Sequence, residues 1–283
     1  MEIALLLLLV CGMAITNATK KSYNTRSAGK GSFTFNTVFT LAATLFFLVT
    51  AKHPLSFSLK LVPYSLAFAL AYGTTIMCTF KAIQCGPLPL TSLATSYSLV
   101  IPTFYGLLFL KEPAGIWLYI GIAFLLISLF LINAKKSDTP ISMKWALYAI
   151  FAFIGNGACS TVQKIQQMHF DGANKNEFMI LALIVVFIFL SLIALTKEKE
   201  DFRPCLKVGI GWMVICGATK GLINLLSMTL VNMLPASLLY PMISAGGIIA
   251  NSVMSRFVYK EKMSRMQYAG VFMGIISVIF LNL

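Results

Sequence analysis

The sequence predicts an all-α polytopic membrane protein with ten transmembrane helices, arranged as two inverted-topology repeats of five (5+5). Three observations support this. The residues are 58% hydrophobic and 11% charged, with a mean hydropathy of +0.85, far more apolar than a water-soluble chain. Ten apolar stretches each approach the roughly 20 residues that cross a bilayer. The segment 111–133 also returns as 260–282, with seven identical positions.

The ten stretches lie between polar or Pro/Gly breaks, and their connections are too short to hold a soluble domain. Residues 3–16 could be read as a secretory signal, but Glu2 stands where basic residues would be needed, so we expect a retained first span. The expected spans are 3–22, 32–51, 61–84, 88–110, 114–134, 144–168, 177–196, 207–231, 236–258 and 264–283.

The repeat divides the chain into residues 1–137 and 138–283. Weaker matches extend it beyond the last helix, including Ser96 with Ser244 and Lys21 with Lys164. Because five is an odd number, the second half is expected to enter the membrane from the opposite side. The identical pairs in the last helix of each half are Lys111/Lys260, Glu112/Glu261, Tyr119/Tyr268, Gly121/Gly270, Ile127/Ile276, Ser128/Ser277 and Asn133/Asn282.

Short motifs in both halves resemble the EamA-type drug/metabolite transporter (DMT) superfamily. Asn251 departs from the pattern, because a proline would answer Pro102 there. The resemblance implies a basket made by the first four helices of each half around a central cavity, braced by the fifth helix. The motif residues are Lys81, Ala82 and Ile83 before Pro87, Pro102 ten residues ahead of Glu112 and Pro113, then Gly121, and in the second half Pro235, Glu261, Gly270 and Gly274.

Basic residues gather at the ends of the apolar stretches, a pattern that sets membrane orientation and does not favour nucleic-acid binding. Of the 22 basic side chains, 15 belong to one side of the membrane and five to the other. The positive-inside rule would place both termini outside, whereas the resemblance implies termini inside, and both orientations stay open. A structural role for Lys21 and Lys164 would remove them from the count. We expect a multi-pass protein of the cytoplasmic membrane.

Lys220 is the charged residue expected deepest in a span. It lies 13 residues from one end of 207–231 and 11 from the other, roughly 17 to 20 Å from either surface. Burying it there costs about 2.5 to 3.5 kcal/mol. All nine acidic residues lie at span ends or in connections, so an anionic group on a transported solute would supply the opposite charge. The alternative is a structural lysine beside the packing pair Gly217 and Gly221.

Other polar residues cluster in six of the ten stretches, which separates cavity-lining helices from lipid-facing ones. Any single Ser or Thr among them could instead bond within its own helix. Pro102, which frees the carbonyl of residue 98, is a candidate hinge together with Pro241, Gly246 and Gly247, and static kinks are the alternative. The candidate substrate-binding residues are Lys220, Asn224, Tyr72, Thr75, Thr95, Ser96, Tyr97, Asn17, Asn156, Ser160, Tyr240 and Ser244.

These observations predict a secondary transporter that moves a small organic metabolite by alternating access. A carboxylate-bearing solute such as an amino acid fits the single deep lysine best, and a cation fits worst. Proton coupling would have to involve Lys220, since no carboxylate is expected at depth. The solute, the direction of transport, the coupling ion and the oligomeric state stay open.

Two other classes of protein remain as alternatives. A polytopic membrane enzyme acting on a lipid or lipid-linked substrate would need buried His, Asp or Glu, and none is expected at depth. A scaffold or receptor would need no lysine at the midplane. The six cysteines form no CxxC pair, so no metal site and no cofactor is expected.

Overall fold

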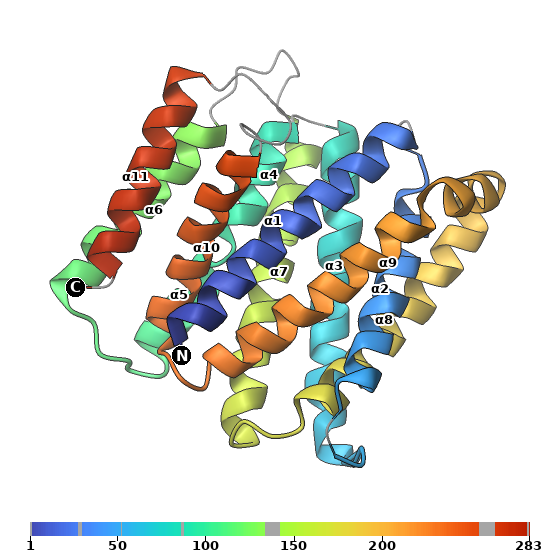
Figure 1. The fold of residues 1–283 in the computed structure, drawn as a ribbon, viewed down its shortest axis with the longest axis horizontal. Helices are drawn as coiled ribbons and strands as arrows, with labels where there is room; N and C mark the ends of the chain where they lie inside the picture. Colours follow the sequence, from blue (N-terminus) through green and yellow to red (C-terminus); the bar gives the residue numbers. More distant parts are fainter. Residues whose placement is uncertain are drawn as a thin grey trace. The chain divides into compact units, whose positions relative to one another are not determined.

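The computed structural model describes residues 2–27, 30–51, 53–85, 88–133, 142–254, 264–281 and 283, and these ranges contain helices and no β-strand. Figure 1 shows the helices in colours that follow the order of the chain. They are α1 (Glu2–Arg26), α2 (Ser32–Val49), the 3₁₀ helix η1 (Leu59–Leu61), α3 (Val62–Cys85), α4 (Leu88–Tyr97), α5 (Val100–Leu108), α6 (Ile116–Asn133), α7 (Met143–His169), α8 (Lys175–Lys197), α9 (Lys199–Leu230), α10 (Ala236–Val253) and α11 (Arg265–Leu281).

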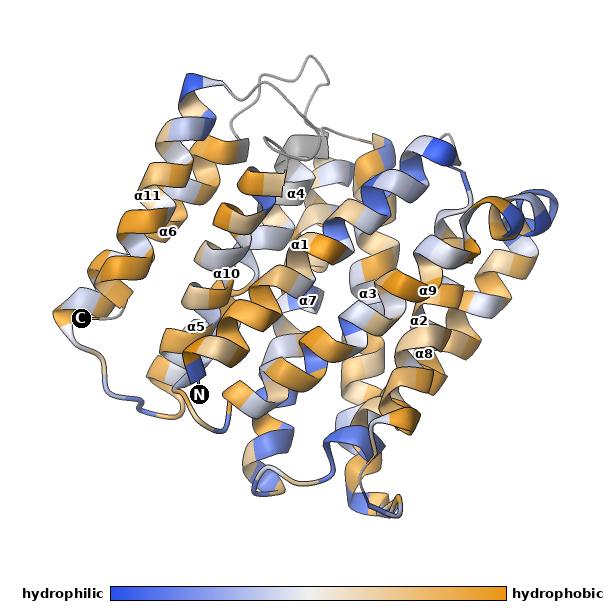
Figure 2. Cartoon of the chain, in the orientation of Figure 1, coloured by the Kyte–Doolittle hydropathy of each residue, from blue (hydrophilic) through white to orange (hydrophobic). Residues whose placement is uncertain are grey.

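The helical pattern is that of a multi-pass membrane protein. Seven helices in the described ranges are long and apolar enough to cross a membrane, and α6 and α11 are shorter apolar helices. The predicted fourth stretch is divided between α4 and α5. In Figure 2 the hydrophobic colour covers the bodies of these helices, while hydrophilic residues gather near their ends. Helices satisfy their backbone hydrogen bonds internally, which is what a lipid environment demands.

The predicted spans 207–231 and 236–258 correspond to α9 and α10. The span expected at 207–231 begins earlier, because α9 starts at Lys199 and its first turn carries Glu200 and Asp201, which stabilise a helix N-terminus. The span expected at 236–258 is helical to Val253. Its predicted end lies outside the described residues, as does Glu261.

The chain forms two compact units. The first unit comprises Met1–Gly73 and Gln166–Thr229, and the second comprises Thr74–Ile165 and Leu230–Leu283. Each unit therefore takes helices from both halves of the sequence. The division into 1–137 and 138–283 describes sequence similarity and stays a prediction.

Close helix packing organises the first unit. A Cβ at Gly217 would collide with the carbonyl of Phe39, and a Cβ at Gly221 would lie 2.6 Å from the ring of Phe46. These glycines of α9 therefore let it approach α2, and the predicted packing pair is present. A cluster of buried residues extends this contact: Tyr23, Phe35, Phe39, Met213 and Cys216.

In the second unit, α6 and α11 pack through a reciprocal contact. The Ser128 hydroxyl donates to the Gly270 carbonyl at 2.6 Å, and the Ser277 hydroxyl donates to the Gly121 carbonyl at 2.8 Å. The two serines are a matched pair of the repeat, and so are the two glycines. The contact is therefore symmetric, with each helix offering the same groups to the other.

Candidate functional site

The second unit contains an interrupted helix, because α4 ends at Tyr97 and α5 begins at Val100. Pro102 has no N–H to donate to the carbonyl of Ser98, which instead accepts from the amide of Ile101 at 3.0 Å. The same carbonyl lies against Gly157 of α7, where a Cβ would come within 2.7 Å of it. The interruption thus lies where Pro102 was predicted to disturb the helix.

Polar side chains hold this interruption in place. The Asn156 side-chain amide, from α7, donates to the Ser98 hydroxyl at 2.6 Å and to the Thr95 carbonyl at 3.2 Å. The Ser98 hydroxyl donates to the same Thr95 carbonyl at 2.6 Å. Two of these bonds satisfy the Thr95 carbonyl, which a continuous helix would have satisfied itself. Asn156, a candidate substrate-binding residue, therefore fixes the shape of the α4–α5 break.

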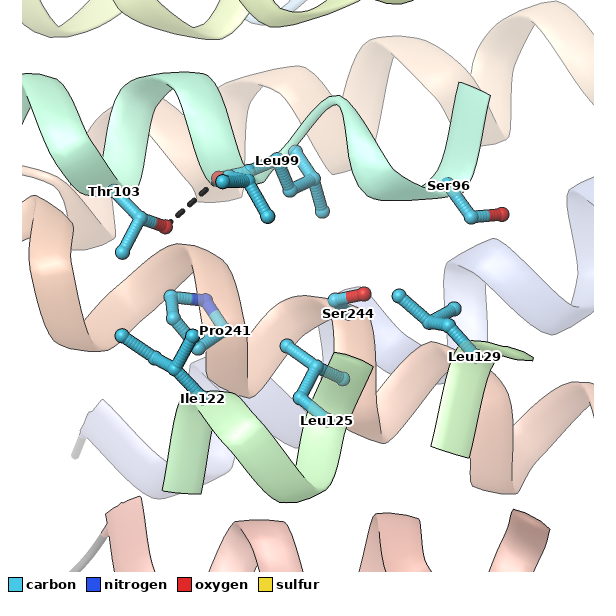
Figure 3. Close-up of a pocket in the computed structure, with 9 residues that line it drawn as sticks. Ser96, Leu99, Thr103, Ile122, Leu125, Leu129, Pro241 and Ser244 are labelled. Carbon is cyan, nitrogen blue, oxygen red and sulfur yellow. Dashed lines mark hydrogen bonds between the residues drawn. The ribbon is translucent and has the colours of Figure 1, made fainter. Parts of the chain in front are cut away.

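A small cavity lies beside the break. Its volume is about 10 Å³, close to the minimum that holds one water molecule. Figure 3 shows Ser96 of α4 and Ser244 of α10 on facing walls, with Pro241 near one end. Ser96 and Ser244 are matched by the repeat, and the structure brings them to one cavity.

Two tyrosines predicted to bind substrate use their hydroxyls to join helices. Tyr97 donates to the carbonyl of Leu126 in α6 at 2.6 Å, and Tyr240 donates to the carbonyl of Ser160 in α7 at 2.8 Å. Tyr240 is only 1% exposed. The Thr95 hydroxyl bonds within its own helix, to Thr91. These contacts form a polar framework between α4, α6, α7 and α10.

A carboxylate fixes the start of α10. Glu112, in the connection after α5, accepts hydrogen bonds from the backbone amides of Ala236 at 2.9 Å and Ser237 at 2.8 Å. Pro235 at the N-cap offers no side-chain bond, so Glu112 supplies the cap. Gly106 makes room for it, because a Cβ there would collide with the carboxylate.

Lys164 of α7 completes this arrangement. Its ammonium lies 3.3 Å from the Glu112 carboxylate and donates to the carbonyl of Val231 at 3.1 Å. Both side chains are largely buried, with exposures of 9% for Lys164 and 11% for Glu112. Desolvation acts to raise the pKa of the Glu112 carboxyl, but the hydrogen bonds from Ser237 and Ala236 and the charge of Lys164 outweigh it and hold the pKa below the usual value.

In the first unit, Lys220 lies half-buried within α9, ten residues before its last residue, Leu230. At about 100° per residue, it lies between two contact faces of the helix. Gly217 and Gly221 face α2, and Ile223 contacts Gly12 of α1. Asn224, one turn on, is 8% exposed.

The candidate substrate-binding residues divide between the two units. Asn17, Tyr72, Lys220 and Asn224 belong to the first. Asn17 is exposed, and Tyr72 packs against the cluster of buried residues that includes Phe35 and Phe39, and stacks on Phe68. The other eight belong to the second unit: Thr75, Thr95, Ser96, Tyr97, Asn156, Ser160, Tyr240 and Ser244.

The candidate hinges differ from one another. Pro102 is the third residue of α5, directly after the break, whereas α10 continues without interruption through Pro241, Gly246 and Gly247.

In the described part of the chain, no three His, Cys, Asp or Glu side chains come together as a group that could hold a metal ion.

The ion pair between Glu112 and Lys164 was not predicted. Glu112 was placed with the other acidic residues at span ends, and its connection folds back so that the carboxylate is buried. The repeat carried a signal, since it duplicates this glutamate as Glu261 and this lysine as Lys21. A charged residue of each sign that recurs in both halves is a candidate for an ion pair.

Comparisons with known proteins agree with this architecture. The model of the EamA-like transporter family matches residues 143–283. No curated protein matches the chain. Among 28 similar chains of solved structures, one crystal structure superposes with a TM-score of 0.73 over 98% of this chain and 98% of that chain, at 11% identity. At this identity the likeness shows the fold alone.

Proposed function

Because the chain belongs to the EamA-like transporter family, whose model matches residues 143–283, we propose that it is a secondary transporter of a small carboxylate-bearing metabolite. Membership makes it a membrane transporter of small molecules. We propose further that the solute carries a carboxylate, that transport proceeds by alternating access, and that the protein lies in the cytoplasmic membrane. Members of the EamA-like family are generally transporters and not enzymes, and the sequence likewise predicts a transporter.

The position of Lys220 carries the proposal. It stands inside an apolar span, about 15 Å from the end of α9 at Leu230. A charge at this depth is costly, and such residues usually meet a substrate, water or another polar group. Asn224, on the next turn of the same helix, adds a donor and an acceptor. An amino-acid carboxylate matches such a pair of side chains.

The reciprocal contact between α6 and α11 supports the inverted 5+5 repeat as part of this proposal. An antiparallel pair of matched helices is what two oppositely oriented halves would produce. Gly121 approaches Leu281, at the far end of α11, while Gly270 approaches Ile132, at the far end of α6. Rocking of two such halves about a shared site is the motion that alternating access requires.

Ligand-dependent stability tests the role of Lys220. The unfolding midpoint of the purified protein is measured with anionic, zwitterionic and cationic metabolites, since a ligand raises it by mass action. Lys220→Met should lose the response to carboxylates. The exposed Lys207, on the same helix, provides the matched control Lys207→Met, which should respond as the original chain does.

Transport in proteoliposomes completes the test. We expect uptake of the stabilising carboxylate by the original chain and by Lys207→Met, and its loss in Lys220→Met with folding preserved. A proton gradient applied to the same vesicles tests coupling. If Lys220→Met transports normally and binds like the control, the lysine is structural and the carboxylate proposal is wrong.

A further inference from the structure

A second cavity lies within the first unit, at the level where several spans end. It is an open pocket of about 590 Å³, within the usual range of small-molecule sites. Thr50 follows α2, Lys175 begins α8, and Leu225 and Thr229 lie near the end of α9. Three span ends therefore surround the pocket, which places it at the membrane surface, within reach of both water and lipid.

The described walls of this pocket carry two basic side chains. The ammonium of half-buried Lys175 donates to the Thr229 hydroxyl at 3.3 Å, which leaves two of its three protons for another acceptor. His53 also lines the pocket and is exposed. Glu177 is the acid that lines the pocket, and its carboxylate accepts from the amide of Ser56 at 3.3 Å.

Backbone groups near Lys175 also favour an anion in the pocket. Asn174, the N-cap of α8, lines the pocket and makes no side-chain cap bond. The first helical bond of α8 runs from the amide of Phe178 to Asn174. In the described structure, the equivalent ends of α2 and α10 each receive a carboxylate, from Glu198 and Glu112. An anion in the pocket would do the same for α8.

We propose that this pocket binds a phosphate oxyanion, free or borne by a lipid, between Lys175 and His53. The site goes beyond the proposed transport function. Leu225 and Thr229 lie about 140 to 180° around α9 from Lys220, so the pocket opens on the opposite face of that helix. Lys175 and a helix N-terminus would hold the ligand as Lys164 and α10 hold Glu112 in the second unit.

Two sources could deliver the oxyanion. A lipid headgroup would reach the pocket from the bilayer, and the exposed apolar side chains of Val49 and Leu48 on α2 would contact its acyl chains. A dissolved phosphate would enter from water. Lys175 and His53 would bind the phosphate group in both cases, so the experiment must separate the two sources.

The test measures the unfolding midpoint of the full-length protein in detergent. Inorganic phosphate and dihexanoyl phosphatidic acid are the two probes, with chloride used to keep the ionic strength equal. Lys175→Met removes the central charge and is compared with Lys60→Met, an exposed lysine of η1 that does not line the pocket. We expect Lys175→Met to weaken binding about tenfold or more, because it removes a charged hydrogen bond.

Each outcome decides the proposal. Stabilisation by both probes that Lys175→Met loses supports a site for free and lipid-borne phosphate, and a response to the lipid alone assigns it to a headgroup. No response to either probe, or an equal response in Lys175→Met and Lys60→Met, overturns the proposal.

Further variants cover the case in which Lys175→Met does not fold. Thr229→Val removes the hydroxyl that orients Lys175, and His53→Gln removes the second basic group. Each should weaken phosphate binding by several-fold, and unchanged binding in both contradicts the site. Lys220→Met separates this site from the transport proposal, since it should retain the phosphate response while losing the carboxylate one.

Discussion

The break between α4 and α5 contrasts with the continuity of α10, the helix that the predicted repeat matches to it. Both stretches contain a proline, yet only the first is interrupted. At the break, Ser98 and Asn156 provide hydrogen bonds to the backbone around Thr95. At α10, Glu112 instead secures the first turn, ahead of Pro241. The helix is therefore interrupted where the side chains of Ser98 and Asn156 satisfy the Thr95 carbonyl, which a continuous helix would pair with a backbone amide.

The largest expected effect comes from removing the cap of the continuous helix. Glu112→Ala should lower the free energy of unfolding by about 3–5 kcal/mol, because it leaves Lys164 buried without its carboxylate. Chemical unfolding in detergent measures the change. Glu200→Ala, at an exposed position in the first turn of α9, is the control and should cost far less. Equal effects would show that Glu112 contributes only as a surface charge.

Acid should reproduce part of this effect. The pKa of the Glu112 carboxyl is held below its usual value of 4.5, so its stabilising contribution is complete above pH 4.5. That contribution is lost as the pH falls through the depressed pKa. The unfolding midpoint of the original chain should therefore fall more steeply below pH 4.5 than that of Glu112→Ala. If the unfolding midpoints of the two proteins fell in parallel with pH, Glu112 would not be the group responsible for the acid sensitivity.

A smaller effect is expected at the interrupted helix. Asn156→Ala removes two hydrogen bonds at the break, to the Ser98 hydroxyl and the Thr95 carbonyl, and should destabilise the protein by about 1–3 kcal/mol. If the break is a hinge, transport should fall further than stability does. A static kink predicts that transport follows the folded fraction. Ser252→Ala, whose hydroxyl bonds within α10, serves as the control.

The smallest effect is expected from Pro102→Ala. The variant regains an N–H, but Ser98 and Asn156 still hold the break, so the free energy of unfolding should change by no more than about 1 kcal/mol. Combining it with Asn156→Ala should allow a continuous helix, visible as a non-additive gain in stability. Additive effects in the double variant would mean that Pro102 and the side chain of Asn156 act independently. The side chains would then not explain why the α4–α5 stretch is interrupted and α10 is not.

Much of the fold was predictable from the sequence, because lipid leaves few choices to an apolar chain. The apolar stretches predicted the helices, Pro102 predicted the disturbed helix, and Gly217 with Gly221 predicted close packing. The start of α9 at Lys199 was missed because the apolar stretch begins only after several charged residues. A helix can nevertheless extend beyond the apolar stretch into water.

The candidate site was less predictable than the fold. Tyr97, Asn156 and Tyr240 were grouped by polarity alone, and the structure shows each bonded to a neighbouring helix. Polarity inside a membrane indicates that a partner is needed, and it does not indicate which partner. Glu112 and Lys164 lie 52 positions apart, and only the fold brings them together.

The reciprocal contact of α6 and α11 is self-complementary, like the interface of a twofold-symmetric dimer. In a twofold-symmetric dimer, a substitution in such a surface acts on both sides at once. Within a single chain, each side now changes alone. Gly270 still fits against Ile132, and Gly121 against Leu281, so neither can gain a methyl group without its neighbour yielding. A substitution in α6 at this contact therefore has to fit α11 as well, and the same holds in the other direction.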